Sequence, residues 1–275
     1  MKTAIRVVDV RKVFGVRGKR GREEHVAVDS VSFELTSGRC LGVVGESGSG
    51  KTTLARMIVG LEIPTSGTID IGGHDRSKKD RSAAARRAWA RRVQMVFQDP
   101  YTSLDRRQTG TACLHEILRL HTDLSEQARK KRVTELAAQV GLTTRQVDQR
   151  PSQLSGGQRQ RLAIARSLAV EPDILVLDES VSALDVSVQA QVLNCLADIK
   201  DQLGMTYVFV SHDLGVIRQI ADDILVMREG RVVEEGPTEE VLSRPQHEYT
   251  QMLKRSVPGP GWKPPVPGGE LGLAK

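Results

Sequence analysis

Residues 45–52 read GESGSGKT, a match to the pattern G-x-x-x-x-G-K-[ST] that strongly constrains the fold. The segment stands between the apolar run CLGVV at 40–44 and the helical run TTLARMIVG at 52–60. In such a strand–loop–helix unit, glycines let the backbone turn tightly, so that successive N–H groups and the helix N-terminus face an anion. A Gly/Ser turn with a surface lysine would not require these flanking elements. The sequence therefore predicts a phosphate-binding loop.

The groups of this loop are predicted to bind ATP and Mg²⁺. Lys51 is expected to reach the β and γ phosphates, and the Thr52 hydroxyl to bind Mg²⁺. The predicted ATP-binding residues of this segment are Gly45, Ser47, Gly48, Ser49, Gly50, Lys51, Thr52 and Thr53.

A second apolar run, ILVL at 174–177, is followed directly by Asp178 and Glu179. Because a phosphate loop needs a second magnesium group, Asp178 is predicted to lie on the metal side. Glu179 projects differently from the strand end, where it could hold or deprotonate the water that attacks the γ phosphate. Alone, an Asp-Glu pair after a strand is commonly a helix cap. The loop upstream favours the magnesium role.

Short β-type runs alternate with longer helical patterns, which is typical of an α/β fold with a largely parallel sheet. The runs 40–44, 174–177 and 207–210 are apolar on both faces and are predicted to be central strands. Alternation at 31–35 predicts that the early strands are antiparallel and half exposed. The other predicted strands are 5–10, 68–71, 93–97, 224–227 and 231–234.

Residues 99–165 have almost no strand signal, and helices are predicted at 116–142 and 158–170. This indicates a helical subdomain inserted in a single domain of residues 1–255. A further helix is predicted at 187–203, ended by Gly204. The stretch 256–275 is rich in Pro and Gly and is expected to be a flexible tail.

The charge balance is basic: 40 Lys and Arg against 34 Asp and Glu give +6 and a pI near 9.4. Much of the excess lies at 11–22 and 76–92, but a charge run is usually a solvated face, so no nucleic-acid partner is predicted. The apolar runs are too short to cross a bilayer, and the first residues do not resemble a secretory signal, so a cytosolic location is expected. Three scattered cysteines, at 40, 113 and 195, predict neither a disulfide frame nor a zinc site.

LSGGQ at 154–158, shortly before ILVLDE, resembles the nucleotide-binding subunits of ABC transporters. Ser155 can cap a helix starting near Gln158, and the N–H groups of Gly156 and Gly157 make a second anion site. In this family the LSGGQ signature faces the γ phosphate bound by a second subunit. The resemblance thus implies an ABC-type ATPase core, with antiparallel β and helical subdomains, in a head-to-tail dimer around two ATP molecules.

Other positions match the family one by one. Gln98, in QMVFQDP, matches the glutamine that touches Mg²⁺ and the attacking water. Asp185, in SALD, matches the loop that couples the two nucleotide sites, and His212, in VFVSHD, matches the histidine at the γ phosphate. Phe14, in KVFG, matches the ring that stacks on adenine. The implied catalytic groups are Glu179, His212 and Gln98; the implied metal groups are Thr52, Gln98 and Asp178.

Five strings narrow the resemblance to the peptide and nickel importer class, particularly its second ATPase subunit: VSFEL, GESGSGKTTLAR, QMVFQDPYTSLD, SALDVSVQAQVLN and HEYTQMLKRSVP. The sequence departs from that class at Ser180, where proline or alanine is common, and at Arg106, where proline is common after TSL. Neither residue supplies a phosphate-binding group, although the Arg106 region bears on docking to the membrane partner. Some members bind an iron–sulfur cluster through C-terminal cysteines. No cysteine follows Cys195, so no cluster is predicted.

The resemblance implies a peripheral subunit at the cytoplasmic face of the cell membrane that hydrolyses ATP and drives two permease subunits. An extracytoplasmic solute-binding protein is implied as an indirect partner. Di- or oligopeptide is the first expected solute, and nickel or a nickel chelate the second. The other ATPase subunit is a related chain or a second copy, and the resemblance favours a related chain. Two alternatives are an ABC-type ATPase acting on nucleic acid or ribosomes and a module that binds ATP without hydrolysis. Two cassettes, a coiled coil or zinc cysteines would indicate the former, and degenerate catalytic residues the latter.

Overall fold

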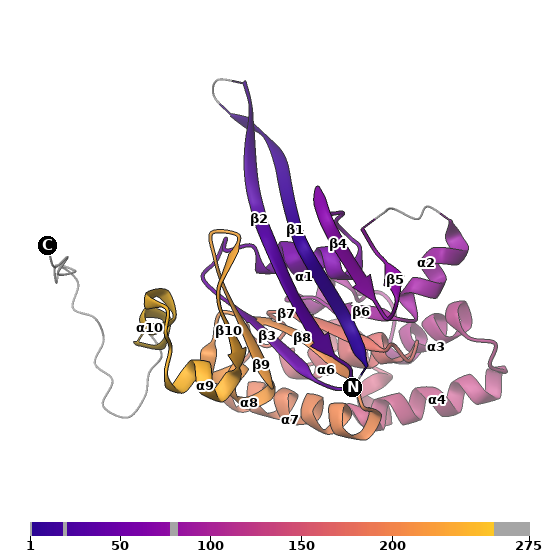
Figure 1. The fold of residues 1–275 in the computed structure, drawn as a ribbon. Helices are drawn as coiled ribbons and strands as arrows, with labels where there is room; N and C mark the ends of the chain where they lie inside the picture. The colour runs from indigo at the N-terminus through magenta and orange to yellow at the C-terminus, as the bar shows by residue number, and fades with distance from the viewer. Residues whose placement is uncertain (1, 19–20, 78–81, 256–275) are drawn as a thin grey trace, which may run out of the picture.

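The computed structural model describes residues 2–18, 21–77 and 82–255, so the predicted tail at 256–275 and part of each basic run lie outside the described residues. The described chain forms two sheets with helices around them (Figure 1). One sheet has six strands in the order β10-β9-β3-β8-β7-β6, and the other has four in the order β2-β1-β4-β5.

The six-stranded sheet is parallel except for its edge strand β10 (Arg231–Pro237), which runs antiparallel to β9 (Asp223–Arg228). The predicted central strands are adjacent and buried at every residue, which confirms that prediction: β3 (Cys40–Val44), β8 (Thr206–Ser211) and β7 (Ile174–Asp178). The prediction for 93–97 is one residue too long, since β6 ends earlier (Val93–Val96). Because parallel strands end at the same edge, the segments after β3, β6, β7 and β8 are brought together there.

The second sheet is antiparallel, as predicted, but its strands are longer than the sequence pattern indicated. They are β1 (Thr3–Gly18), β2 (Gly21–Thr36), β4 (Ser66–Ile71) and the short β5 (His74–Asp75). The β1–β2 register shifts between Val7 and Lys12, and Asp9 and Ser30 have left-handed backbone conformations. These bulges reset the alternation of buried and exposed side chains, so the pattern was lost there while the pairing continues.

Helices cover both faces of the six-stranded sheet. Helix α1 (Lys51–Val59) lies between the two sheets, where Leu54, Met57 and Ile58 are buried in the core that both sheets share. Helices α7 (Val186–Leu203) and α8 (Leu214–Ile220) pack on the opposite face (Figure 1). Gly204 has a left-handed conformation and ends α7, as predicted. Helix α2 (Ala83–Ala90) and the C-terminal helices α9 (Thr238–Ser243) and α10 (Glu248–Arg255) were not predicted.

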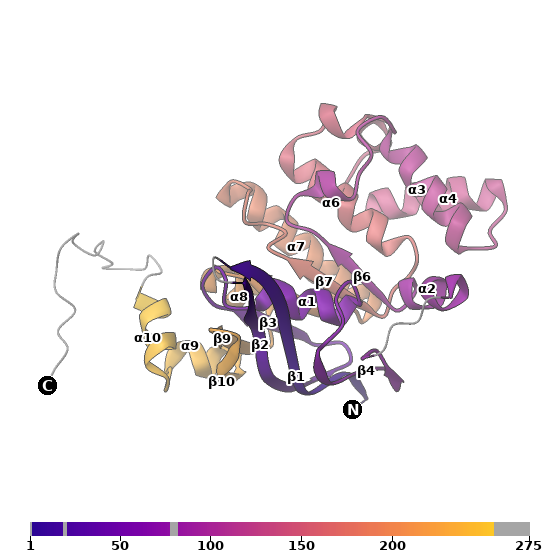
Figure 2. The ribbon, with the colours of Figure 1, turned by 90° about the horizontal axis from the view of Figure 1, so that it is seen from above.

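The helices of the inserted segment gather on one side of the molecule (Figure 2). They are η1 (Pro100–Thr102), α3 (Gly110–His121), α4 (Glu126–Gln139), α5 (Thr144–Val147), η2 (Pro151–Gln153) and α6 (Gly156–Leu168). The prediction of one helix over 116–142 is wrong. Thr122 is extended and ends α3, and the Ser125 hydroxyl accepts a hydrogen bond from the Ala128 amide to start α4.

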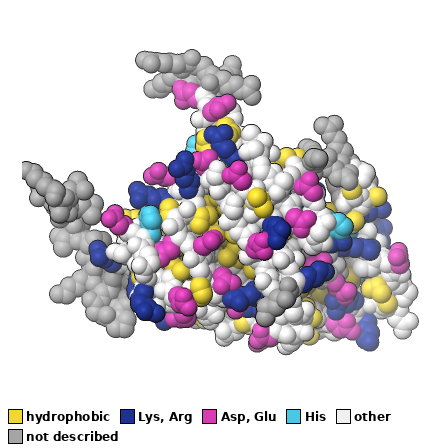
Figure 3. All heavy atoms as spheres, viewed as in Figure 1, with side chains coloured by type: hydrophobic (Ala, Val, Ile, Leu, Met, Phe, Trp, Pro, Cys, Tyr) yellow, Lys and Arg dark blue, Asp and Glu magenta, His cyan; other side chains and the backbone are white. Residues whose placement is uncertain are grey.

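The face shown in Figure 3 carries Lys and Arg side chains interspersed with Asp and Glu. No helix among the described residues combines the length and apolarity needed to span a membrane.

Candidate functional site

The phosphate loop is held against the two neighbouring sheets by close backbone packing. A Cβ on Gly45 would lie 2.1 Å from the Met227 carbonyl oxygen at the end of β9, and one on Gly50 would lie 2.3 Å from the Ala27 carbonyl oxygen of β2. Both glycines also have positive φ angles, of 151° and 101°. A Cβ at Gly48 would meet nothing within 4 Å. Glycine is therefore required where the loop is packed, while its middle is open to a ligand.

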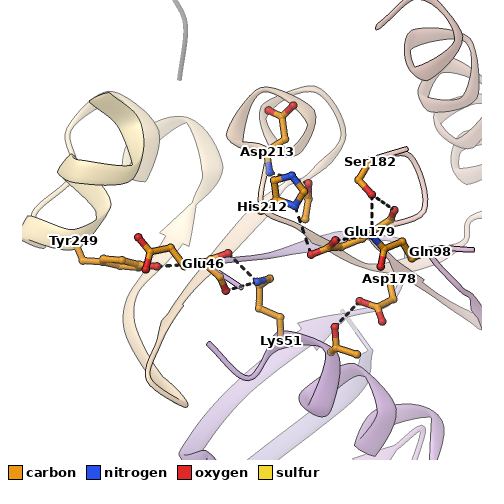
Figure 4. Close-up of polar contacts among 12 residues, drawn as sticks. Glu46, Lys51, Gln98, Asp178, Glu179, Ser182, His212, Asp213 and Tyr249 are labelled. Atoms are coloured by element: carbon orange, nitrogen blue, oxygen red, sulfur yellow. Dashed lines mark hydrogen bonds and ion pairs between the residues drawn. The ribbon is translucent and has the colours of Figure 1, made fainter. Parts of the chain in front are cut away.

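Lys51, the first residue of α1, points back under the loop (Figure 4). Its Nζ atom donates hydrogen bonds of 2.7 Å to both the Gly45 and the Glu46 carbonyl oxygens, and the side chain is buried. Burial lowers the pKa of Lys51, while the carboxylates of Glu179, Asp178 and Glu46 oppose this shift. The two bonds engage two of the three donors of an ammonium group. The loop thus fixes the cation beside the place where its backbone is open.

Thr52 and Asp178 meet although they are far apart in sequence. The Thr52 hydroxyl donates a 3.0 Å hydrogen bond to Asp178 Oδ1, which joins the start of α1 to the end of β7. Burial raises the pKa of Asp178, and the hydrogen bond from Thr52 opposes the shift. A hydroxyl and a carboxylate are hard oxygen donors of the kind Mg²⁺ takes, with water and phosphate oxygens completing its shell. This donor pair fits the predicted metal.

Glu179 is the centre of a cluster of polar side chains drawn in Figure 4. Its Oε2 atom accepts a 3.2 Å hydrogen bond from Gln98 Nε2, and its Oε1 atom lies 3.5 Å from His212 Nδ1. The Ser182 hydroxyl bonds the Glu179 carbonyl oxygen at 2.9 Å and lies 3.4 Å from Gln98 Nε2. The three side chains predicted to be catalytic are therefore brought together from the ends of β6, β7 and β8.

The backbone at Glu179, directly after β7, has an uncommon conformation. Glu179 has a φ of 46°, and its N–H donates a 3.0 Å hydrogen bond to the Val210 carbonyl oxygen. A left-handed conformation at a residue with a Cβ is strained. The Glu179 carboxylate lies beside His212, whereas that of Asp178 bonds Thr52.

The LSGGQ residues form a separate group at the N-terminus of α6. The Ser155 hydroxyl accepts a hydrogen bond from the Gln158 amide at 3.3 Å, and Gln158 Oε1 accepts one from the Ser155 amide at 2.9 Å. This capping box starts the helix at Gly156, two residues earlier than predicted. A Cβ on Gly157 would lie 2.3 Å from Val188 of α7. The signature therefore packs beside the start of α7.

Asp185 immediately precedes α7 and has an exposed side chain, as does Val186 after it. A Cβ on Gly156 would lie 3.2 Å from Leu184 Cδ2, so the segment before α7 lies beside the signature. These two predicted groups adjoin each other and not the glycines of the phosphate loop, whose close contacts are with β2 and β9.

Phe14 lies on β1 and pairs with His25 of β2, two residues before the Ala27 carbonyl that packs on Gly50. Its ring is half-buried and lies 4.7 Å from Lys12 Nζ. The structure thus places Phe14 on the hairpin beside the loop rather than in the core.

Two residues near the site were missed by sequence reasoning. Ser182 bonds Glu179, and the Tyr249 hydroxyl of α10 accepts a 2.9 Å hydrogen bond from the Glu46 amide in the phosphate loop. Tyr249 lies in the string HEYT, which in the sequence analysis indicated only the peptide and nickel importer class. Tyr249 is 203 positions from Glu46, and nothing in the sequence indicates that the two residues are in contact.

A phosphate loop, a Thr–Asp pair and a carboxylate at the ends of parallel strands define a P-loop nucleoside triphosphatase. A family model described as "ABC transporter" matches residues 28–182, more than half of the chain. Dipeptide transport ATP-binding proteins of Haemophilus influenzae and Escherichia coli are 45% and 44% identical over 256 residues, which are 92% of this chain and 78% and 76% of theirs. The chain belongs to the ABC transporter family and is one of its ATPases.

A second family model, "Oligopeptide/dipeptide transporter, C-terminal region", matches residues 233–269. Among solved structures, the ATP-binding cassette MJ0796, a dimer in a post-hydrolysis state bound to ADP and Pi, is 29% identical with a TM-score of 0.76. The match covers 85% of this chain and 98% of that one. The cbiO1 protein of Clostridium perfringens, part of a cbiONQ transporter complex, is 26% identical with a TM-score of 0.77, over 89% and 92%. These cassettes confirm the predicted fold class.

Proposed function

We propose that this chain is the ATPase subunit of an importer of di- or oligopeptides, peripheral to the membrane and bound to two permease subunits. The observation that carries the proposal is the match of residues 233–269 to the C-terminal region of oligopeptide and dipeptide transporters. The names of the relatives support the same solute class. Import of nickel or a nickel chelate, the second solute expected from the sequence, is the alternative to peptide import.

The site supports a specific division of roles in ATP hydrolysis. Lys51 binds the β and γ phosphates, because its ammonium is held beside the open part of the loop. Thr52 and Asp178 would hold Mg²⁺, together with Gln98; the bound ion neutralises phosphate charge. Glu179 accepts a proton from the attacking water. Gln98 and His212 both contact the Glu179 carboxylate and orient it, and His212 also contacts the γ phosphate.

The separate position of the signature supports a head-to-tail dimer. Gly156 and Gly157 present backbone N–H groups at the start of α6, a place that favours an anion. Because that helix end packs beside α7 and not against its own phosphate loop, its anion is the γ phosphate of ATP on another subunit.

Ser155→Arg is expected to leave ATP binding by the isolated chain within about twofold and to lower ATPase activity of the assembled dimer by about 10²-fold or more. The bulky side chain would fill the helix end that receives the partner's phosphate. Nucleotide affinity of the isolated chain and ATPase activity of the assembled dimer check the two parts. Light scattering with Mg-ATP, with the partner subunit added if it is required, shows whether the dimer closes.

Ser155→Ala is the matched control, because it also removes the hydroxyl that caps α6 but adds no bulk. It should cost about 1 kcal/mol of stability and leave far more activity than arginine. Weakened ATP binding in an isolated Ser155→Arg monomer would mean that the signature acts on its own chain's nucleotide, and the head-to-tail model would be wrong.

The solute is tested in proteoliposomes that contain this chain with its partner ATPase, permease and solute-binding subunits. ATP is expected to drive accumulation of a radiolabelled dipeptide, whereas a non-hydrolysable analogue does not. Accumulation of radioactive nickel but not of peptide would overturn the peptide assignment and leave the ATPase intact.

A further inference from the structure

Helix α10 lies at the C-terminal end of the described chain and reaches the phosphate loop (Figures 1 and 4). Its Tyr249 is 2% exposed, and its hydroxyl oxygen accepts the 2.9 Å hydrogen bond from the Glu46 N–H. The Arg228 guanidinium lies over the tyrosine ring at 5.1 Å. The ring belongs to the hydrophobic core, while its hydroxyl ends on a backbone group of the phosphate loop.

The peptide unit between Gly45 and Glu46 is held from both ends. Its N–H is bonded to Tyr249, and its carbonyl oxygen, that of Gly45, accepts a hydrogen bond from Lys51 Nζ. In a planar trans peptide the N–H and C=O point in opposite directions, so the two bonds together fix the orientation of the plane. Glycine at position 45 supplies little restraint of its own.

We propose that Tyr249 is a positioning residue of the ATPase site: its hydroxyl orients the Gly45–Glu46 peptide so that the Gly45 carbonyl holds Lys51 ready for the phosphates. This inference rests on the proposed role of Lys51. It makes the C-terminal helix part of the nucleotide site and couples the docking of that helix to nucleotide affinity.

Other contacts keep α10 in place, so the hydroxyl can be removed alone. The Glu234 carboxylate on β10 accepts hydrogen bonds from the Gln246 amide at 2.8 Å and the His247 amide at 3.2 Å. Lys254 donates a 2.9 Å bond to the Ser243 carbonyl oxygen. Tyr249→Phe keeps the ring and these bonds and deletes only the acceptor for Glu46.

Tyr249→Phe is expected to weaken ATP binding and raise KM for ATP by about 3- to 10-fold, the worth of one neutral hydrogen bond. The turnover number kcat should change little, because the lost contact lies at the loop and not at Glu179. A merely structural role would instead lower the active fraction and leave KM unchanged. The measurement is the KM and kcat of the assembled ATPase together with direct nucleotide affinity.

Tyr207→Phe is the matched control. Tyr207 is also fully buried, and its hydroxyl donates one 2.9 Å hydrogen bond, to the Leu196 carbonyl oxygen in the core. This variant should lose comparable stability with unchanged KM. An unchanged KM in Tyr249→Phe, or the same increase in both variants, would overturn the proposal. Absent ATP binding in the unaltered chain would instead refute the function of the loop itself.

Hydrogen exchange supplies a reciprocal readout, because coupling between two sites acts equally in both directions. A non-hydrolysable ATP analogue should slow amide exchange in α10 of the unaltered chain. That protection should be reduced by the same factor as the affinity in Tyr249→Phe. Equal protection in both chains would contradict the coupling.

Discussion

Glu179→Gln is expected to keep ATP binding while slowing hydrolysis by about 10²- to 10⁴-fold. Glutamine is nearly isosteric with glutamate, so it can occupy the same place between Gln98 and His212. Its amide cannot accept the proton of the attacking water. The loop, Lys51 and the Thr52–Asp178 pair are unchanged, and ATP should therefore trap the closed dimer. Gel filtration with Mg-ATP and single-turnover hydrolysis measure the two effects.

Glu171→Gln is a matched control, since Glu171 is also a glutamate with a left-handed backbone, at φ 53°. Its carboxylate is exposed and contacts Arg132 at 3.0 Å, away from the phosphate loop. That variant should hydrolyse ATP normally. Near-normal turnover in Glu179→Gln would move the base elsewhere, with His212 the first candidate.

Lys51→Ala is expected to lower ATP affinity by about 10²-fold or more, because it removes charge-assisted bonds to two phosphates. The fold should persist, since the glycines that shape the loop are retained, although the Gly45 and Glu46 carbonyls lose their donor. Calorimetric titration with ATP and circular dichroism should be recorded on the same preparation.

Lys200→Ala separates loss of binding from loss of stability. Lys200 is another largely buried lysine, paired with Asp222 at 2.7 Å, and its removal should destabilise the chain without changing ATP affinity. Unaltered affinity in a folded Lys51→Ala chain would refute the proposed role of the loop lysine.

The sequence predicted the parts of the fold whose cause is local. The three central strands are apolar on both faces, and Gly204 ends α7 by a conformation that glycine favours. The prediction from sequence failed where one stretch fits two interpretations. The helical pattern of 116–142 does not reveal the break between His121 and Ser125. The bulges near Asp9 likewise ended the predicted strand, whereas backbone pairing continued.

In the candidate site, sequence motifs identified residues whose positions follow from strand ends. Gln98, Glu179 and His212 meet because β6, β7 and β8 are parallel neighbours. Tyr249 and Ser182 could not be found in this way, because their roles arise from the packing of α10 on the loop and from a turn after β7.

At Glu179, the left-handed backbone brings the stability of the fold and the proposed catalysis into conflict. A non-glycine residue in that conformation costs about 1–2 kcal/mol, which glycine would largely recover. Glycine there, however, would leave the proposed attacking water without its base. At position 179, selection for heat resistance alone would therefore favour glycine and an inactive chain, whereas selection for turnover keeps the carboxylate.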